Sequence, residues 1–198
     1  MIKKIAIRVV VVIGVIALGF GLMNYEALWK KLKFAFHNPE PVAQQNQNTS
    51  EPQNAEPNRL KIPSLSIEAP LVESAEANEA DYQEALQTGV VHFPGTAKVG
   101  ELGNAYYFGH SSDFAFAKGD YKTVFALLPN IEMGAEIVVT NADGVDFKYA
   151  VIEKKVVNNN DVSVLEQGDR TQKLLSLQTS YPVGTALQRY VVVAKLVE

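Results

Sequence analysis

The chain has 198 residues, of which 47% are hydrophobic and 20% are charged, a normal composition for a folded domain with a membrane segment. It contains no cysteine, which excludes disulfides, thiolate metal sites and thiol catalysis for this sequence. Residues 1–36 carry six Lys/Arg and one Glu, a net charge of +5. Because the whole chain has a net charge of −4, the remaining residues carry −9. An acidic soluble part argues against nucleic acid as a partner.

The chain opens with an apolar run, residues 9–23. Extended back to Ile5, this stretch forms a helix about 28 Å long, close to the ~30 Å hydrocarbon core of a bilayer. Arg8 lies near its end, where a long side chain reaches the headgroups. No convincing small-x-small cleavage site follows, which favours an uncleaved membrane anchor over a signal peptide.

The orientation of this anchor is less clearly encoded. Lys3, Lys4 and Arg8 favour an inside N-terminus, whereas a second group of lysines at residues 30–33 opposes it. The following segment is typical of an exported spacer. We therefore expect a single-pass protein of the cell membrane with an extracytoplasmic C-terminal domain.

The apolar residues from Tyr25 to Phe36 repeat with helical spacing, with lysines off the stripe. Two interpretations remain open: a helix that rests on anionic headgroups, or an extension of the membrane helix. Residues 37–58 are rich in Asn, Gln and Pro and contain almost nothing to bury, so they are predicted to be a disordered tether. This divides the chain into an anchor and juxtamembrane helix (1–36), a tether (37–58) and a folded domain (59–198).

The folded domain reads as short strands with turns between them. The pattern predicts two strands broken at Pro63 and Ser64, a helix over 79–87, a strand over 105–112 and one or two helical turns over 121–128. The clearest hairpin covers 136–157 and turns at Asn141–Gly144, because Asp-Gly is a strong turn signal. A polar loop over 158–171 contains a small apolar patch, Val162 to Leu165.

The last two strands run from Leu174 to Val197 around a turn with Pro182 and Gly184. Ser180 closes the first strand and Arg189 opens the second, so the two residues can lie side by side at one end of a sheet. Several short strands with only short helices predict an all-β fold, an antiparallel barrel or sandwich.

The three histidines differ in their settings. His37 lies in or beside the tether, and His92 sits in a Pro/Gly turn where a loop-bracing hydrogen bond is expected. His110 follows an apolar strand and a glycine, a position suited to proton transfer, although position alone favours a structural role somewhat more.

Other kinds of site find little support. Two histidines eighteen residues apart without cysteine do not make a metal site, and no phosphate-binding glycine loop is present. A Ser-His-Asp hydrolase would combine His110 and Ser180 with an acid such as Asp113 or Asp143. Ser180 lacks the G-x-S-x-G elbow, and aspartates are plentiful by chance.

Three stretches together resemble the sortase family of membrane-anchored cysteine transpeptidases of bacterial surfaces. The resemblance covers nearly all of residues 59–198 and includes the stretches RLKIPSLSIEAPLV, GVVHFPGTAKVGELGNAYYFGHSSDF and LLSLQTSYPVGTALQRYVVVAKL. The resemblance implies a closed eight-stranded β-barrel. It also implies cleavage of a peptide sorting signal after a Thr through an acyl-enzyme, followed by transfer to an amine acceptor, with no cofactor.

By motif, the resemblance places the family's histidine on His110, its arginine on Arg189 and its nucleophilic cysteine on Ser180. A hydroxyl is far too weak an acid to be ionised by the field that activates a thiol, so serine requires a general base. Three interpretations stay open: a sortase silenced by deliberate replacement of its cysteine, a natural peptide-binding or structural module at the cell surface, and a serine-based acyl transferase or hydrolase.

Overall fold

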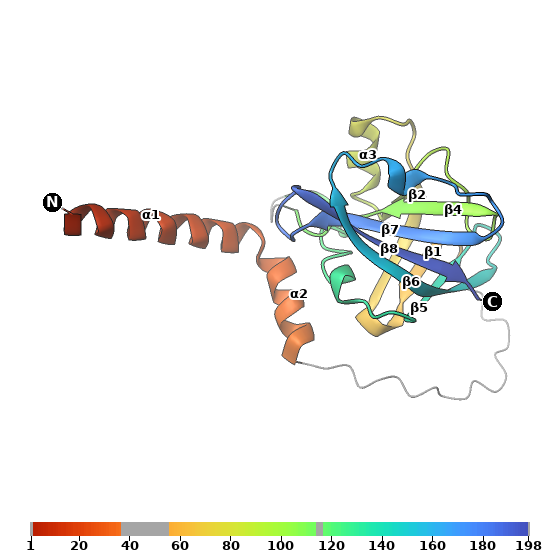
Figure 1. The fold of residues 1–198 in the computed structure, drawn as a ribbon, viewed down its shortest axis with the longest axis horizontal. Helices are drawn as coiled ribbons and strands as arrows, with labels where there is room; N and C mark the ends of the chain where they lie inside the picture. The colour runs from red at the N-terminus through yellow and green to blue at the C-terminus, as the bar shows by residue number, and fades with distance from the viewer. Residues whose placement is uncertain (1, 37–55, 114–116, 198) are drawn as a thin grey trace.

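The computed structural model describes residues 2–36, 56–113 and 117–197. Two helices come first, α1 (Ile2–Met23) and α2 (Tyr25–Phe36). The backbone N–H and the side-chain amide of Asn24 both donate to the Phe20 carbonyl, which ends α1, and α2 then turns sharply away from its axis (Figure 1). The stretch Lys4–Met23 is long and apolar enough to cross a membrane. Most of the predicted tether, residues 37–55, lies outside the described residues.

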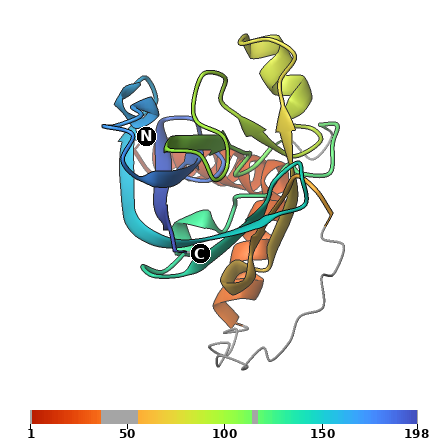
Figure 2. The ribbon, with the colours of Figure 1, turned by 90° about the vertical axis from the view of Figure 1, so that its right-hand side faces the viewer.

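Eight strands close into a barrel, with the neighbour order β1-β2-β3-β4-β7-β8-β6-β5 and β5 pairing back to β1 (Figures 1 and 2). The strands are β1 (Arg59–Ile62), β2 (Ile67–Glu73), β3 (Val90–His92), β4 (Gly103–Phe108), β5 (Glu136–Thr140), β6 (Asp146–Asn158), β7 (Lys173–Tyr181) and β8 (Gln188–Leu196). The helical elements among them are short: η1 (Pro63–Leu65), α3 (Glu79–Ala85), η2 (Leu128–Asn130) and η3 (Ser163–Leu165). The predicted all-β barrel with short helices is confirmed.

The expectation of a purely antiparallel barrel is wrong at two places. Strands β2 and β3 pair in parallel, and so do β4 and β7. Residue alternation indicates that a segment is a strand but not which way it runs beside its neighbour. Parallel neighbours need a long connection, and β4 and β7 are separated by the whole of β5, β6 and their loops.

The core follows from the alternation of each strand. Inward-facing side chains of β1, β7 and β8 are fully buried in one cluster, including Leu60, Leu175, Leu177, Val192 and Ala194. A second, smaller cluster lies on the outer face of the barrel, where Val164 packs with Tyr106, Val191 and Val193. The apolar patch in the predicted loop 158–171 therefore fastens this loop to the outside of β4 and β8.

The predicted hairpin is formed by β5 and β6, whose strands pair from Glu136–Ala150 to Thr140–Asp146. Its turn is held by its own residues: Asn141 Oδ1 accepts hydrogen bonds from the backbone N–H groups of Asp143 and Val145 at 3.0 and 2.9 Å. Gly144 has φ +78°, a conformation that favours glycine. The tight turn is thus set by local chemistry.

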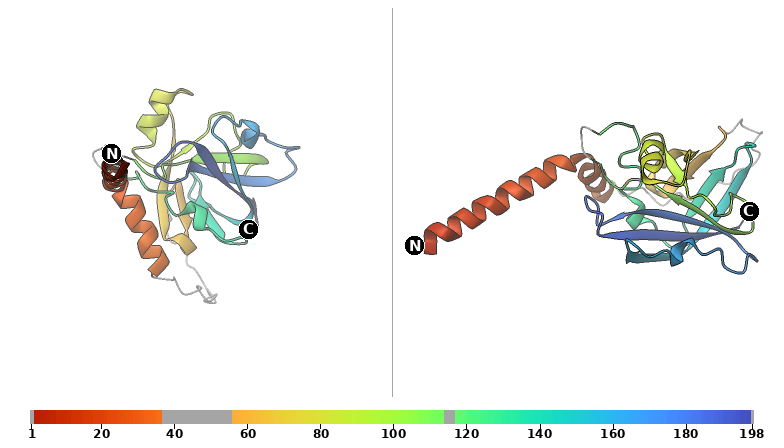
Figure 3. Two further views of the ribbon diagram at one scale, coloured as in Figure 1. Left: turned by 60° about the vertical axis from the view of Figure 1, so that its left-hand side comes forward. Right: turned by 90° about the horizontal axis from the view of Figure 1, so that it is seen from above.

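Helix α2 packs against the barrel on one side. Ala27 is buried in a cluster with Ala126 and Val183, residues of the loop after residue 120 and of the β7–β8 loop. The β7–β8 loop lies at the end of the barrel toward α1, and the end of β8 lies at the other (Figure 3). This contact defines which end of the barrel is next to the N-terminal helices.

Candidate active site

Strands β7 and β8 bring Ser180 and Arg189 together. They are direct partners in the antiparallel register, one pair before the strands separate into the connecting loop. The expectation that these residues lie side by side is confirmed. The Arg189 guanidinium donates from Nη1 to the carbonyls of Ala186 and Gln188 at 3.2 and 3.1 Å. These bonds to the β7–β8 loop hold the cation at this end of the two strands.

The parallel pairing of β4 and β7 brings His110 to the same edge. Phe108 pairs with Gln178, the Gly109 N–H donates to the Gln178 carbonyl at 3.0 Å, and the buried Thr179 hydroxyl donates to the Gly109 carbonyl at 2.8 Å. Parallel strands point their carboxyl ends to the same side of a sheet. The chain that leaves β4 therefore reaches His110 beside the end of β7.

The backbone of His110 is fixed by a hydrogen bond, and its side chain is largely buried. Its carbonyl accepts a hydrogen bond from the Phe125 N–H at 2.9 Å, and Asp113 Oδ2 lies 3.9 Å from its Nε2. Burial lowers the pKa of His110 below its usual value of about 6.5, and the Asp113 charge offsets part of this effect. The imidazole is therefore neutral near pH 7 and can accept a proton.

All three residues line one groove of about 350 Å³ on the outer face of β4, β7 and β8. Its other walls come from α3, β4, Phe93 and the loop after β6, and they combine apolar with polar side chains. The apolar ones are Tyr82, Leu86, Phe93, Tyr106, Phe108, Val162, Val164 and Leu165, and the polar ones include Glu79, Gln83, Asn159, Asn160 and Asp161. The groove therefore offers a small molecule or a peptide both apolar contacts and hydrogen-bonding groups.

Two polar groups in the groove are not among the residues singled out from the sequence. The Tyr106 hydroxyl donates to Gln178 Oε1 at 2.6 Å. Burial raises the pKa of Tyr106, and the positive charge of Arg189 partly offsets the rise, so the guanidinium acts on the same part of the groove. The available signal was strand periodicity, since Gln178 and Ser180 lie on one face of β7.

The other histidines differ. His92 is buried and braces its loop, with Nδ1 2.9 Å from Glu73 Oε2 and Nε2 near Thr96 Oγ1 and the Ala97 carbonyl, as expected. His37 lies outside the described residues.

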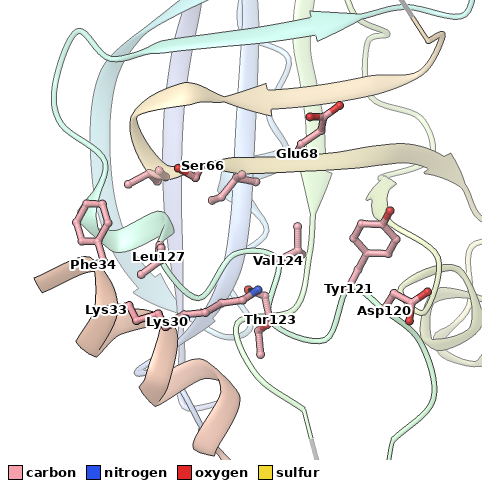
Figure 4. A pocket seen from close by; sticks show the side chains of 12 residues that line it. Lys30, Lys33, Phe34, Ser66, Glu68, Asp120, Tyr121, Thr123, Val124 and Leu127 are labelled. Atoms are coloured by element: carbon pink, nitrogen blue, oxygen red, sulfur yellow. Dashed lines mark hydrogen bonds between the residues drawn. The ribbon is translucent and has the colours of Figure 1, made fainter. Parts of the chain in front are cut away.

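A larger cavity of about 600 Å³ lies between α2 and the barrel (Figure 4). Lys30 reaches across it toward Thr123, whose carbonyl accepts a hydrogen bond from Nζ at 3.4 Å. Its lining mixes Lys30 and Lys33 with Glu68 and Asp120. None of the three candidate residues lines it. The smaller groove is therefore the candidate active site.

Comparison with known proteins agrees with the family resemblance found in the sequence. Residues 60–197 match the family model of the Sortase domain. The chain is similar to a sortase D5 transpeptidase from Clostridium perfringens, with 26% identity, a TM-score of 0.57, and 71% of this chain and 78% of that one covered. No protein matched in a search of the curated proteins.

Two further solved structures share the fold. The sortase A lid mutant from Corynebacterium diphtheriae has 24% identity and a TM-score of 0.59, over 71% of this chain and 69% of that one. Sortase C1 from Streptococcus suis has 18% identity and a TM-score of 0.60, over 73% and 74%. At these identities the likeness concerns the barrel and its topology.

Proposed function

Because this chain belongs to the sortase family, we propose that it is a membrane-anchored, sortase-type protein that binds the C-terminal sorting signal of a surface protein. Residues 1–36 anchor it, 37–58 are the tether, and 59–198 form the binding domain outside the cell. The observation that carries the proposal is the single groove lined by His110, Ser180 and Arg189.

The groove supplies both kinds of contact that an extended peptide needs. Aromatic side chains such as Phe93 and Phe108 offer apolar surface along its length. Arg189 stands at the reacting end, where it donates to a substrate carbonyl and stabilises the oxygen that becomes negative during acyl transfer. Both features are independent of the atom at the nucleophile position, so peptide binding does not require cysteine.

Chemistry at Ser180 is slow compared with that of a cysteine enzyme. A thiol beside a histidine and an arginine becomes a thiolate, whereas the hydroxyl of Ser180 keeps its proton until a base removes it during attack. The shorter C–O bond also sets the nucleophile back from the position of sulfur. The main function of the chain as written is thus recognition of the signal, with transpeptidation lost or strongly slowed.

One observation favours a second candidate, a serine acyl transferase. The neutral imidazole of His110 can remove the Ser180 proton as Oγ attacks the scissile carbonyl carbon. The C–N bond then breaks, the leaving amine takes that proton, and an ester remains on Ser180. An acceptor amine attacks the ester, gives a proton to His110, and the C–O bond breaks as Ser180 recovers its hydrogen.

The proposal is tested by Ser180→Cys in the full chain, with labelled peptides that carry sorting signals of sortase substrates. We expect the chain with Ser180 to bind such a peptide, and the variant to cleave it much faster because a thiolate is the stronger nucleophile. Ser176→Cys is the matched control. It adds a thiol to the same strand, β7, four residues before position 180, where the partner on β8 is Val193 rather than Arg189.

Cleavage by Ser180→Cys should disappear when His110→Ala or Arg189→Ala is added. Mass spectrometry of the chain with Ser180 after long incubation decides between the two candidates: an acyl ester on Ser180 supports the serine transferase, and its absence with intact binding supports the binding module. If neither this chain nor Ser180→Cys binds or cleaves any such peptide, the proposed function is wrong.

A further inference from the structure

Helix α2 has two different faces. The residues turned toward the barrel are Asn24 at its start, then Ala27, Lys31 and Phe34, which are buried or half-buried. A second set of large apolar side chains is exposed, and we call it the α2 stripe: Tyr25, Leu28, Trp29, Leu32 and Phe36. At about 100° per residue, the two sets fall on roughly opposite sides of the helix.

The barrel therefore does not bury the side chains of the α2 stripe. Trp29 is 55% exposed and Phe36 is 79% exposed, although each residue is one that proteins normally bury or place at an interface. A cation borders the stripe, since Lys33 Nζ lies 5.7 Å from the centre of the Trp29 ring. Aromatic and aliphatic groups beside lysines are the composition of a helix that lies in a bilayer surface.

The placement of α1 indicates where that bilayer is. α1 ends directly before α2 and is long and apolar enough to span a membrane. In the structure α1 projects away from the barrel, and α2 runs across its end with the barrel on the far side (Figures 1 and 3). A membrane crossed by α1 thus faces the side of α2 that the barrel leaves uncovered.

The opposite face of α2 contacts both loops that carry the candidate active site. Ala27 packs with Ala126, one residue after Phe125, whose N–H bonds the His110 carbonyl. Ala27 also packs with Val183 of the β7–β8 loop, three residues after Ser180.

A second contact reinforces the first at the corner between the helices. A side chain added at Gly184 would come within 2.6 Å of the Phe20 ring and 3.1 Å of Asn24, so the β7–β8 loop sits tightly against the end of α1. The Gly184 N–H in turn donates to Ser112 Oγ at 2.9 Å, two residues after His110. The reactive end of the barrel is thus fixed to the helix corner.

We infer that the α2 stripe lies in the headgroup region of an anionic bilayer, and that α2 holds the active-site end of the barrel against the membrane surface. The groove then opens beside the bilayer. The inference rests on the anchoring part of the proposed function and does not depend on the chemistry at Ser180.

The first experiment uses Trp29, which is the single tryptophan of the chain. The full chain is reconstituted in vesicles of phosphatidylcholine and phosphatidylglycerol, and Trp29 fluorescence is quenched either by brominated acyl chains or by aqueous iodide. We expect strong quenching by bromine and protection from iodide. The variant Leu28→Glu/Leu32→Glu should reverse the pattern, whereas Leu102→Glu/Met133→Glu, two exposed apolar residues on the barrel, should not.

The second experiment locates the two ends of the barrel, using the lack of cysteine to attach one fluorophore at a time. Leu187→Cys labels the β7–β8 loop and Asp143→Cys labels the β5–β6 turn at the opposite end. With a quencher on the lipid headgroups, we expect the label at 187 to be quenched several-fold more than the label at 143. The charged stripe variant should reduce this difference.

Each outcome has a distinct meaning. If the chain is removed from vesicles by alkaline carbonate, α1 does not insert and the proposed anchoring itself is wrong. If α1 stays inserted while Trp29 remains open to iodide, or the two labels are quenched equally, the inference about α2 is overturned and the proposed peptide binding is untouched.

Discussion

The two ends of the barrel are built in different ways. At the far end, β5 and β6 are joined by a turn whose hydrogen bonds come from Asn141 itself, and the buried Thr140 hydroxyl donates to Asp146 six residues away. At the active-site end, Thr179 donates to Gly109, seventy residues distant, and Gly184 donates to Ser112, again from another part of the chain.

This difference shows how stability and function are divided. The β5–β6 turn at the far end is held mainly by short-range contacts that form together with their own strands, joined by one long-range hydrogen bond from the Asn58 N–H to the Asn141 carbonyl. The loops of the active-site end are fixed to one another and to α2 by partners that are distant in the sequence. Equal damage at the two ends should therefore affect folding similarly but peptide binding very differently.

The largest effect is expected for Phe125→Ala. Phe125 is fully buried and packs on Gly109, where an added Cβ would meet its ring at 2.8 Å. Its removal should lower the free energy of unfolding by about 3–5 kcal/mol and loosen the His110 loop. Urea denaturation and peptide titration at low urea measure the two effects separately.

Ile137→Ala is the control for this change, since Ile137 is equally buried but lies in β5. It should cost about 2–5 kcal/mol and leave the affinity of the folded protein for peptide unchanged. Equal losses of affinity in both variants would show that the two ends are not independent.

The two buried threonines offer a closer comparison. Thr179→Val removes the donor to the Gly109 carbonyl in a buried setting and should lower the free energy of unfolding by about 1–3 kcal/mol. Thr140→Val leaves Asp146 open to water and should lower it by only about 0.5–1.5 kcal/mol. Thermal unfolding of both variants tests the order, and a larger loss for Thr140→Val would contradict it.

A smaller effect separates stability from binding. Asn141→Ala should lower the free energy of unfolding by about 0.5–1.5 kcal/mol through loss of its turn hydrogen bonds, without changing peptide affinity. Ser112→Ala should do the opposite, weakening peptide binding about two- to fivefold because the β7–β8 loop loses its contact through Gly184. Titration calorimetry and urea denaturation of the same samples would show whether the two variants really diverge.

The smallest effect is a pH dependence confined to the active-site end. Because the pKa of His110 is lowered by burial, the unfolded chain binds more protons than the folded one as pH falls through about 6.5 toward the lower folded value. Stability should therefore decrease over that window in the unsubstituted chain and decrease less in His110→Gln. Identical slopes of unfolding free energy against pH would show that His110 is not desolvated.

The same division explains what could be predicted from the sequence. The β5–β6 hairpin and its turn were predicted because Asn141 to Gly144 act locally, and the pairing of Ser180 with Arg189 was predicted because one loop joins their strands. The position of His110 beside them depends on the parallel pairing of β4 and β7. Strand alternation carries no information on direction, so the placement of His110 beside Ser180 and Arg189 depended on the family resemblance.

The packing of α2 against the barrel could not be predicted from the sequence for a related reason. Its apolar periodicity was visible, but of the residues turned toward the barrel only Phe34 is large and apolar, while Ala27 and Lys31 give no signal of burial. Tyr106 and Gln178 were missed because a tyrosine in an aromatic strand and a glutamine in an apolar one look like ordinary strand residues. Their hydrogen bond arises only from the register of β4 with β7.

The closure of the barrel has a consequence for how a peptide is recognised. At the groove, β7 has β4 on one side and β8 on the other, so it presents no free row of backbone N–H and carbonyl groups there. A peptide bound along β7 is therefore unable to join it as an added strand, the mode by which many domains hold extended ligands regardless of side chain. Selectivity must come from side-chain pockets and loop backbone, and exchanging loops should redirect it while the barrel stays the same.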